Sequence, residues 1–172
     1  LAMGRMVKSG VIGRFYADKN GLTMGFLVDT ANPTYGGSSY TGQPNDPMPA
    51  FHGIGMYTGE DLFPGFGSEL VSTNVTSSTG QVFAVASNAP ANIVAVNYSP
   101  TDNTVTTFNL TGVTNASVDV WQKNSGSLDP VDLGTINVTG GSFNYTLSAY
   151  TATTFVVTPT TPPPPTPTGL AA

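Results

Sequence analysis

From Glu69 onward, short apolar runs recur at regular intervals, and turn-forming residues separate them. Runs of this length and spacing are typical of antiparallel strands in two packed sheets. The sequence therefore predicts a mainly β protein, an antiparallel β-sandwich of about eight strands. The expected strands cover residues 69–75, 81–87, 92–98, 103–110, 116–122, 132–138, 142–148 and 152–157.

Two of these runs indicate how the strands are buried. Phe143, Tyr145 and Leu147 alternate with small polar residues, so one face of that strand is expected to be buried and the other exposed to solvent. Residues 93–96 are all apolar, as expected for a central strand that is covered on both faces.

The first 68 residues have a different pattern, which predicts a short α/β segment with two short helices and a hairpin. The expected order is a helix over 1–9, a β-hairpin between Val11 and Val28 around Asn20-Gly21, a loop over 32–49 and a helix over 48–58. Gly53 and Gly55 weaken the second helix.

The C-terminal tail is rich in threonine and proline between Thr158 and Thr168. Proline lacks a backbone donor and favours an extended chain, so the tail is expected to be a semi-rigid linker. Three parts are therefore predicted, namely 1–68, the sandwich 69–158 and the tail 159–172. Leu1–Val7 reads as the middle of a helix, which suggests a fragment of a longer protein.

Composition excludes several kinds of site. The chain has no cysteine and only one histidine, His52, so thiol chemistry and zinc sites with sulfur ligands are ruled out. We predict no metal and no cofactor. Its net charge of −5 repels phosphate backbones, so nucleic acid is not an expected partner. No apolar run approaches the roughly 20 residues that span a bilayer, so no membrane partner is predicted either.

The order of these parts resembles the C-terminal region of secreted glycoside hydrolases of families 44, 39 and 30, in which an eight-stranded β/α barrel precedes a β-sandwich. The resemblance covers roughly residues 1–158. It rests on Pro49-Ala50-Phe51-His52-Gly53-Ile54-Gly55-Met56-Tyr57, on Phe66-Gly67-Ser68, on Ala91–Tyr98 with its strand ending in Asn, and on the closing strands in Phe143–Phe155.

This resemblance has a consequence for catalysis. It implies that residues 1–9 correspond to the seventh barrel helix and that Val11–Tyr16 correspond to the eighth barrel strand. The acid/base and nucleophile glutamates of such enzymes follow the fourth and seventh strands, which would lie upstream of Leu1. No catalytic residue is therefore expected in this chain.

The ionisable residues support the same expectation. Retaining glycosidases need two carboxyl groups about 5 to 5.5 Å apart and inverting ones about 6.5 to 9.5 Å. The only glutamates are Glu60 and Glu69, with Asp61 near the first. An Asp61 and Glu69 pair is sterically possible, but solvated loop carboxylates or caps are the favoured interpretation. His52 is interpreted as a structural histidine.

Sugar binding would need aromatic rings, since a pyranose presents flat C–H patches that stack on them. Trp121 shares strand parity with Asp119, so it is expected to point away from the sandwich core, toward a sugar or an interdomain contact. The other candidates for carbohydrate binding are Tyr98, Tyr35, Tyr40, Phe15 and Tyr16.

Three functions remain open at this point. The first is a non-catalytic scaffold or accessory portion of an extracellular, endo-β-glucanase-like hydrolase, with a polysaccharide such as β-glucan and the upstream barrel as partners. The second is a stand-alone carbohydrate-binding module, and the third is a structural sandwich without sugar affinity. The apolar pattern of residues 1–60 suits packing on barrel elements. Without those elements this segment is expected to expose an apolar surface, which could drive self-association.

Overall fold

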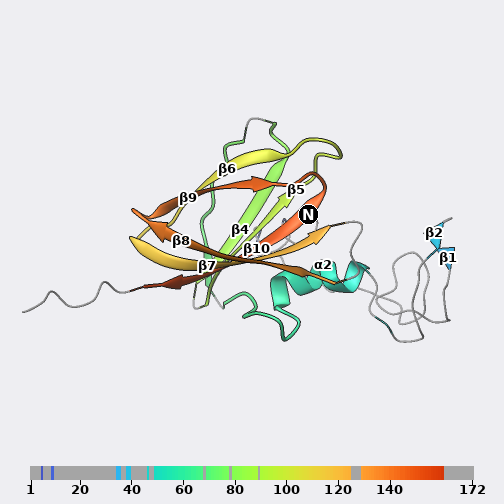
Figure 1. The fold of residues 1–172 in the computed structure, drawn as a ribbon, viewed down its shortest axis with the longest axis horizontal. Helices are drawn as coiled ribbons and strands as arrows, with labels where there is room; N and C mark the ends of the chain where they lie inside the picture. Colours follow the sequence, from blue (N-terminus) through green and yellow to red (C-terminus); the bar gives the residue numbers. More distant parts are fainter. Residues whose placement is uncertain are drawn as a thin grey trace, which may run out of the picture.

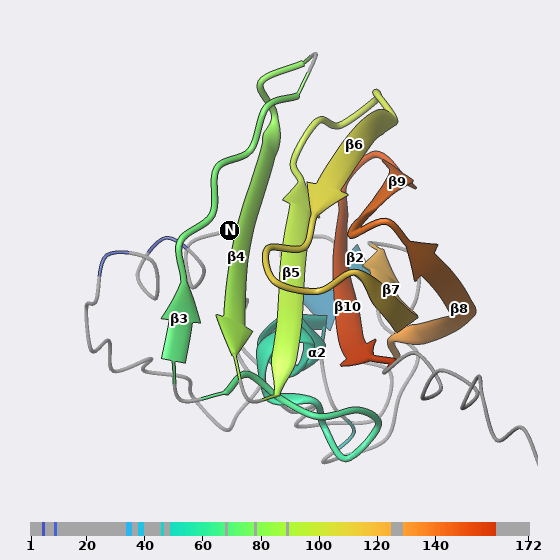
Figure 2. The same cartoon turned by 90° about the vertical axis from the view of Figure 1, so that its left-hand side faces the viewer.

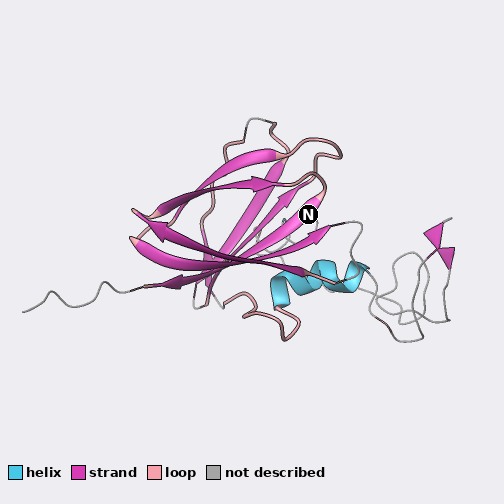
Figure 3. Cartoon of the chain, in the orientation of Figure 1, coloured by secondary structure: helices cyan, strands magenta, loops and turns pink. Residues whose placement is uncertain are grey.

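A computed structural model describes residues 5, 9, 34–35, 38–39, 46, 49–67, 69–77, 79–88, 90–124 and 129–160. Strands dominate this part of the chain (Figure 3). Its elements are β1 (Thr34–Tyr35), β2 (Ser38–Ser39), α2 (Pro49–Thr58), β3 (Glu69–Val71), β4 (Val82–Asn88), β5 (Ala91–Asn97), β6 (Thr104–Asn109), β7 (Asn115–Asn124), β8 (Val131–Thr139), β9 (Ser142–Leu147) and β10 (Thr151–Pro159).

The strands β3 to β10 form two antiparallel sheets. The larger sheet has six strands in the order β3-β4-β5-β10-β7-β8, and the smaller one pairs β6 with β9. Figure 1 shows β6 and β9 on one side of the larger sheet and α2 on the other. Figure 2 shows β3, β4, β5 and β10 side by side. The helix and the small sheet therefore cover opposite faces of the six-stranded sheet.

The core between the two sheets is built on aromatic rings. The rings of Phe108 and Phe143 stack with centroids 5.0 Å apart, and both rings contact Phe155. Tyr145 meets Phe155 edge to face at 5.0 Å. Burial of these rings removes large apolar areas from water, which holds the small sheet on the large one.

A second apolar cluster lies between the six-stranded sheet and α2. Met56 and Tyr57 of the helix pack with Val85, Val94 and Val156 of the sheet. Val94 and Ala95 are both fully buried, although their side chains belong to the clusters on opposite faces. The prediction of a central strand covered on both faces is therefore confirmed.

The sequence predicted the sandwich well. All eight predicted strands occur as β3 to β10, and Phe143 and Leu147 are buried between exposed neighbours. Two helices were predicted, and the structure describes one in full, α2, together with a helical Arg5 in the range of the other. Of the first predicted helix only Arg5 and Ser9 are described, with Ser9 N–H donating to Arg5 O.

Other predictions for the N-terminal segment have different outcomes. The predicted hairpin from Val11 to Val28 lies outside the described residues. The loop predicted over 32–49 contains the short antiparallel pair β1 and β2, which its irregular sequence did not indicate. No described helix is long and apolar enough to cross a membrane. The division at residue 68 stays a prediction.

Candidate functional site

The C-terminal end of α2 is followed by three residues in the left-handed region. Gly59 has φ of 90°, Glu60 of 47° and Asp61 of 62°. Glycine adopts such angles readily, whereas Glu and Asp do so at a cost. Hydrogen bonds from Gly59 N–H to Gly55 O and from Phe63 N–H to Gly59 O fix the turn. The turn directs the chain back along the helix.

This turn brings Glu60 onto His52. Glu60 Oε2 lies 2.6 Å from His52 Nδ1, and both side chains are more than nine-tenths buried. Gly55 makes room for the carboxyl group, because a Cβ there would lie 1.3 Å from Glu60 Oε1. The interpretation of Glu60 as a solvated loop carboxylate is therefore wrong. His52 is buried and structural, as predicted, but its carboxylate partner was missed.

Two further charged residues adjoin this pair. Asp129 Oδ1 lies 3.4 Å from His52 Nε2, and the Asp129 side chain is largely exposed. Lys123 of β7 is buried, and its Nζ donates to Asn124 O. Burial lowers the pKa of Lys123 below its ordinary value of 10.5, while the charges of Asp129 and Glu60 oppose that shift. The four side chains form a charged cluster at the end of β7.

The arrangement of this cluster does not suit acetal cleavage. The imidazole of His52 occupies the space between Glu60 and Asp129, where a sugar and a water molecule would have to enter. Asp61 and Glu69, the other pair considered, are both exposed. The described residues also contain no group of three or more side chains suited to hold a metal ion. The cluster instead ties the turn to α2 and β7.

Polar contacts fix α2 and the segment after it to the sheet. Thr154 Oγ1 of β10 donates to Met56 O at 2.7 Å in the buried interface. The buried Asn92 of β5 donates from Nδ2 to Gly65 O at 2.8 Å and to Pro64 O. Gly67 N–H donates to Ser87 Oγ at 3.0 Å. Helix, turn and sheet are thus joined by directional bonds as well as apolar packing.

Trp121 lies on the helix side of the sheet, as its parity predicted. Its ring packs against Phe63 with centroids 5.2 Å apart, and the side chain is half-buried. One face of the indole is therefore occupied by the turn that follows α2. The alternative to sugar stacking, an interdomain contact with a barrel, stays a prediction.

The other predicted sugar-binding residues are scattered. Tyr98 follows β5, is partly exposed, and donates from its hydroxyl to Gly80 O at 2.9 Å. Tyr35 lies in β1, while Tyr40, Phe15 and Tyr16 lie outside the described residues. Trp121 and Tyr98 are on different strands, separated by β10. The described part of the chain thus does not gather the predicted aromatics into one site.

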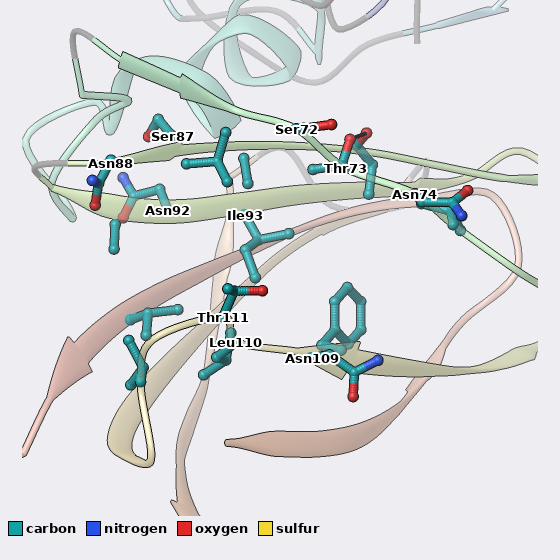
Figure 4. Close-up of a pocket in the computed structure, with 18 of the residues that line it drawn as sticks. Ser72, Thr73, Asn74, Ser87, Asn88, Asn92, Ile93, Asn109, Leu110 and Thr111 are labelled. Atoms are coloured by element: carbon teal, nitrogen blue, oxygen red, sulfur yellow. Dashed lines mark hydrogen bonds between the residues drawn. The ribbon is translucent and has the colours of Figure 1, made fainter.

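A groove opens between the sheets on the side of β3 and β4. It encloses a cavity of about 230 Å³ between β4, β5 and the segment from Thr106 to Val113. In Figure 4, Ile93 projects from the large sheet into the gap toward Leu110 and Thr111. Apolar and small polar side chains line the groove, and none of them is ionisable. The groove therefore offers no general acid or base.

One exposed aromatic residue was missed by the sequence analysis. Tyr150, in the turn between β9 and β10, is 61% exposed and has φ of 54°. Little in the sequence indicated that Tyr150 is exposed. An aromatic residue that directly precedes an apolar run is ordinarily assigned to the buried face of the strand. Its position beside Tyr98 emerges only from the pairing of β10 with β5.

Comparison with known proteins identifies relatives by structure. No protein-family model matches the chain, and no curated protein is significantly similar in sequence. A family 44 endoglucanase from Clostridium thermocellum superposes with a TM-score of 0.56 at 26% identity, covering 63% of this chain and 23% of the enzyme. A family 30 endoxylanase from Clostridium papyrosolvens gives 0.53 at 26% identity, covering 64% and 28%.

A third structure has the same fold. The bifunctional glucanase-xylanase CelM2, from a metagenome library, gives a TM-score of 0.58 at 24% identity over 69% of this chain and 24% of that protein. The matched region thus spans only about a quarter of each of these enzymes. In fold, this chain resembles part of the glycoside hydrolases of families 44 and 30.

Proposed function

We propose that this chain is the C-terminal β-sandwich portion of an extracellular, polysaccharide-degrading glycoside hydrolase, in which it serves as a non-catalytic scaffold for an upstream barrel. The observation that carries the proposal is the structural match to endoglucanases and xylanases over about a quarter of their length. The activities of these endoglucanases and xylanases favour a β-linked glucan or xylan as the substrate of the parent enzyme.

The positions of the carboxylates support a non-catalytic role. Glu60 is engaged by His52, whereas Glu69 is exposed on the edge strand β3. Hydrolysis of a glycosidic bond needs two carboxyl groups on either side of an open substrate site. The His52 ring lies between Glu60 and Asp129 and leaves no open site between them, so we assign bond cleavage to residues upstream of Leu1.

The helix side of the six-stranded sheet supports a scaffold role. There Thr154 bonds α2 and Glu60 bonds His52 of the helix, while Asn92 bonds Gly65 in the segment that follows. Phe51 and Leu62 remain exposed on this layer, at 37% and 47%. A rigid layer with apolar side chains on its outside suits attachment to a second domain. We assign this layer to the contact with the barrel.

The test uses the complete reading frame that contains this chain. Two strand-end glutamates in a preceding β/α barrel are expected, and their absence would refute the proposal. In that full-length enzyme, Gly55→Ala should lower the temperature at which β-glucanase activity is lost, because it displaces Glu60. Gly53→Ala is the matched control, since a Cβ there meets nothing within 4 Å. Equal inactivation of both variants would contradict the scaffold role.

Self-association through residues 1–60 is part of the same proposal. Without the barrel, the attachment layer should be exposed and the isolated chain should associate. Sedimentation velocity over a range of concentrations measures this. A monomer at every concentration would count against an attachment layer on this side of the sheet.

A further inference from the structure

We propose that Tyr150 and Tyr98 form a sugar-binding surface at the end of the six-stranded sheet where β5 ends and β10 begins. Its ligand would be a chain of β-linked pyranoses. The inference goes beyond the scaffold role and depends on it only for the choice of polysaccharide.

The backbone at Tyr150 is the first observation. A φ of 54° puts an L residue in the left-handed region, where Gly or Asn is usual and a bulky side chain is costly. The ring gains little by burial in return, because the residue is 61% exposed. A strained, exposed aromatic residue that does not contribute to the core points to a role on the surface.

The turn that carries Tyr150 is fixed on both sides. Tyr150 N–H donates to Ser99 O at 2.9 Å, and Ala149 N–H donates to Asn103 Oδ1 at 2.9 Å. Thr151 Oγ1 donates to Ser148 O at 2.8 Å. The backbone of Tyr150 is therefore held in place before any ligand arrives, which lowers the entropic cost of binding.

Tyr98 lies beside this turn. The β10 to β5 register ends at Thr151 and Asn97, and beyond it Tyr150 N–H donates to the carbonyl of Ser99, the residue after Tyr98. The Tyr98 hydroxyl donates to Gly80 O at 2.9 Å, which orients its ring, and the residue remains partly exposed. Tyr98, which follows β5, and Tyr150, which precedes β10, thus lie at the same end of the sheet.

Polar groups adjoin the two tyrosines. Thr101, Asp102 and Asn103 are exposed in the loop between β5 and β6. Asp102 accepts a bond from Ser99 Oγ at 3.0 Å, which orders this loop. Pyranose recognition combines an aromatic face for the C–H patches with nearby polar groups for the hydroxyls. Trp121 fits this description less well, because Phe63 covers one face of its ring.

Affinity electrophoresis of the whole 172-residue chain tests the proposal, with hydroxyethylcellulose, xyloglucan and xylan as separate probes in the gel. The wild type should be retarded by at least one of them. Tyr150→Gly should weaken binding about tenfold, which corresponds to about 1.4 kcal/mol. Tyr150→Phe should retain most of the retardation because it keeps the ring. Val105→Ala, at an exposed position of β6, is the control and should bind as the wild type does.

Thermal unfolding of the same variants shows whether weaker binding results from loss of the ring or from loss of the folded structure. Tyr150→Gly relieves the left-handed strain, so its melting temperature should be at least that of the wild type even though its binding is weaker. Wild-type mobility unchanged by all three polysaccharides would overturn the proposal. Equal retardation of the wild type and Tyr150→Gly would do so too. Neither result would affect the proposal of an upstream barrel, because that proposal is tested separately by sequencing the complete reading frame.

Discussion

Glu60 Oε2 lies 2.6 Å from Nδ1 of His52, and this contact closes the turn that follows α2. The two residues are eight positions apart, so a straight helix would place them more than two turns, about 12 Å, apart along its axis, with no direct contact. Left-handed backbone at Gly59, Glu60 and Asp61 reverses the chain and makes the contact. The pair thereby fixes the layer that we assign to the barrel interface.

The space above Gly55 gives the first prediction. Gly55→Ala should lower the free energy of unfolding by about 2 to 4 kcal/mol, because the new Cβ overlaps the Glu60 carboxyl and breaks its bond to His52. Gly53→Ala in the same helix should raise it by about 0.5 to 1 kcal/mol. Urea unfolding of both variants measures the difference. The same sign of change in both would show that the carboxyl does not occupy this space.

Asn97 gives a second prediction, about the sandwich itself. Its fully buried side chain donates to Asp102 O at 2.8 Å and to Leu147 O at 3.1 Å, and accepts from Ser99 N–H. Asn97→Ala leaves these groups unpaired and should cost about 2 to 4 kcal/mol. Asn109→Ala, at the exposed end of β6, should change stability by less than about 0.5 kcal/mol. Similar costs at both sites would contradict the bonding at Asn97.

The sandwich was predictable from the sequence because strand burial leaves a local trace. The alternation around Phe143 and Leu147 and the doubly apolar run at Val94 and Ala95 both reflect the face that each side chain occupies. The end of α2 left no such trace. Its geometry depends on left-handed angles at Glu60 and Asp61 in succession, and Glu is a residue type that rarely adopts them.

The candidate site was harder to predict for a related reason. The contact between Glu60 and His52 depends on a tertiary turn, and the position of Tyr150 beside Tyr98 depends on the register of β10 against β5. Neither relationship involves a fixed sequence spacing. Trp121 was correctly placed facing away from the sandwich core, but Phe63, which packs on it, lies between the predicted helix over 48–58 and the predicted strand over 69–75, where no element was predicted.

Lys123 gives a prediction about pH. Because burial lowers its pKa in the folded state, the unfolded chain binds more protons between that lowered value and 10.5, so this group makes the protein more stable as the pH rises through the window. Lys123→Met removes the titration. The stability of the wild type relative to this variant should therefore increase as the pH rises toward 10.5. Paired urea titrations across this range provide the measurement.

Tyr145 titrates in the opposite sense and must be considered in the same experiment. Burial raises its pKa above 10.0, so it stabilises the fold below that pH and the contribution is lost as the pH rises through the raised value. Both proteins contain Tyr145, so its effect cancels in the comparison. A stability difference that stays constant with pH would show that Lys123 is not desolvated.

Strain at Tyr150 gives a prediction independent of any ligand. Tyr150→Gly should raise the free energy of unfolding by about 0.5 to 1 kcal/mol, since glycine adopts the left-handed angle without a Cβ clash. Tyr150→Ala keeps the clash and should bring no such gain. Chemical unfolding of the two variants side by side separates the effect of the backbone from the loss of the ring.

Reducing-sugar release by this chain alone, with β-glucan and xylan as substrates, tests the central claim most directly. The account predicts release no greater than a buffer blank for the wild type, Glu60→Gln and Glu69→Gln, because the described carboxylates do not flank an open sugar site. Release by the wild type that either substitution abolishes would contradict it.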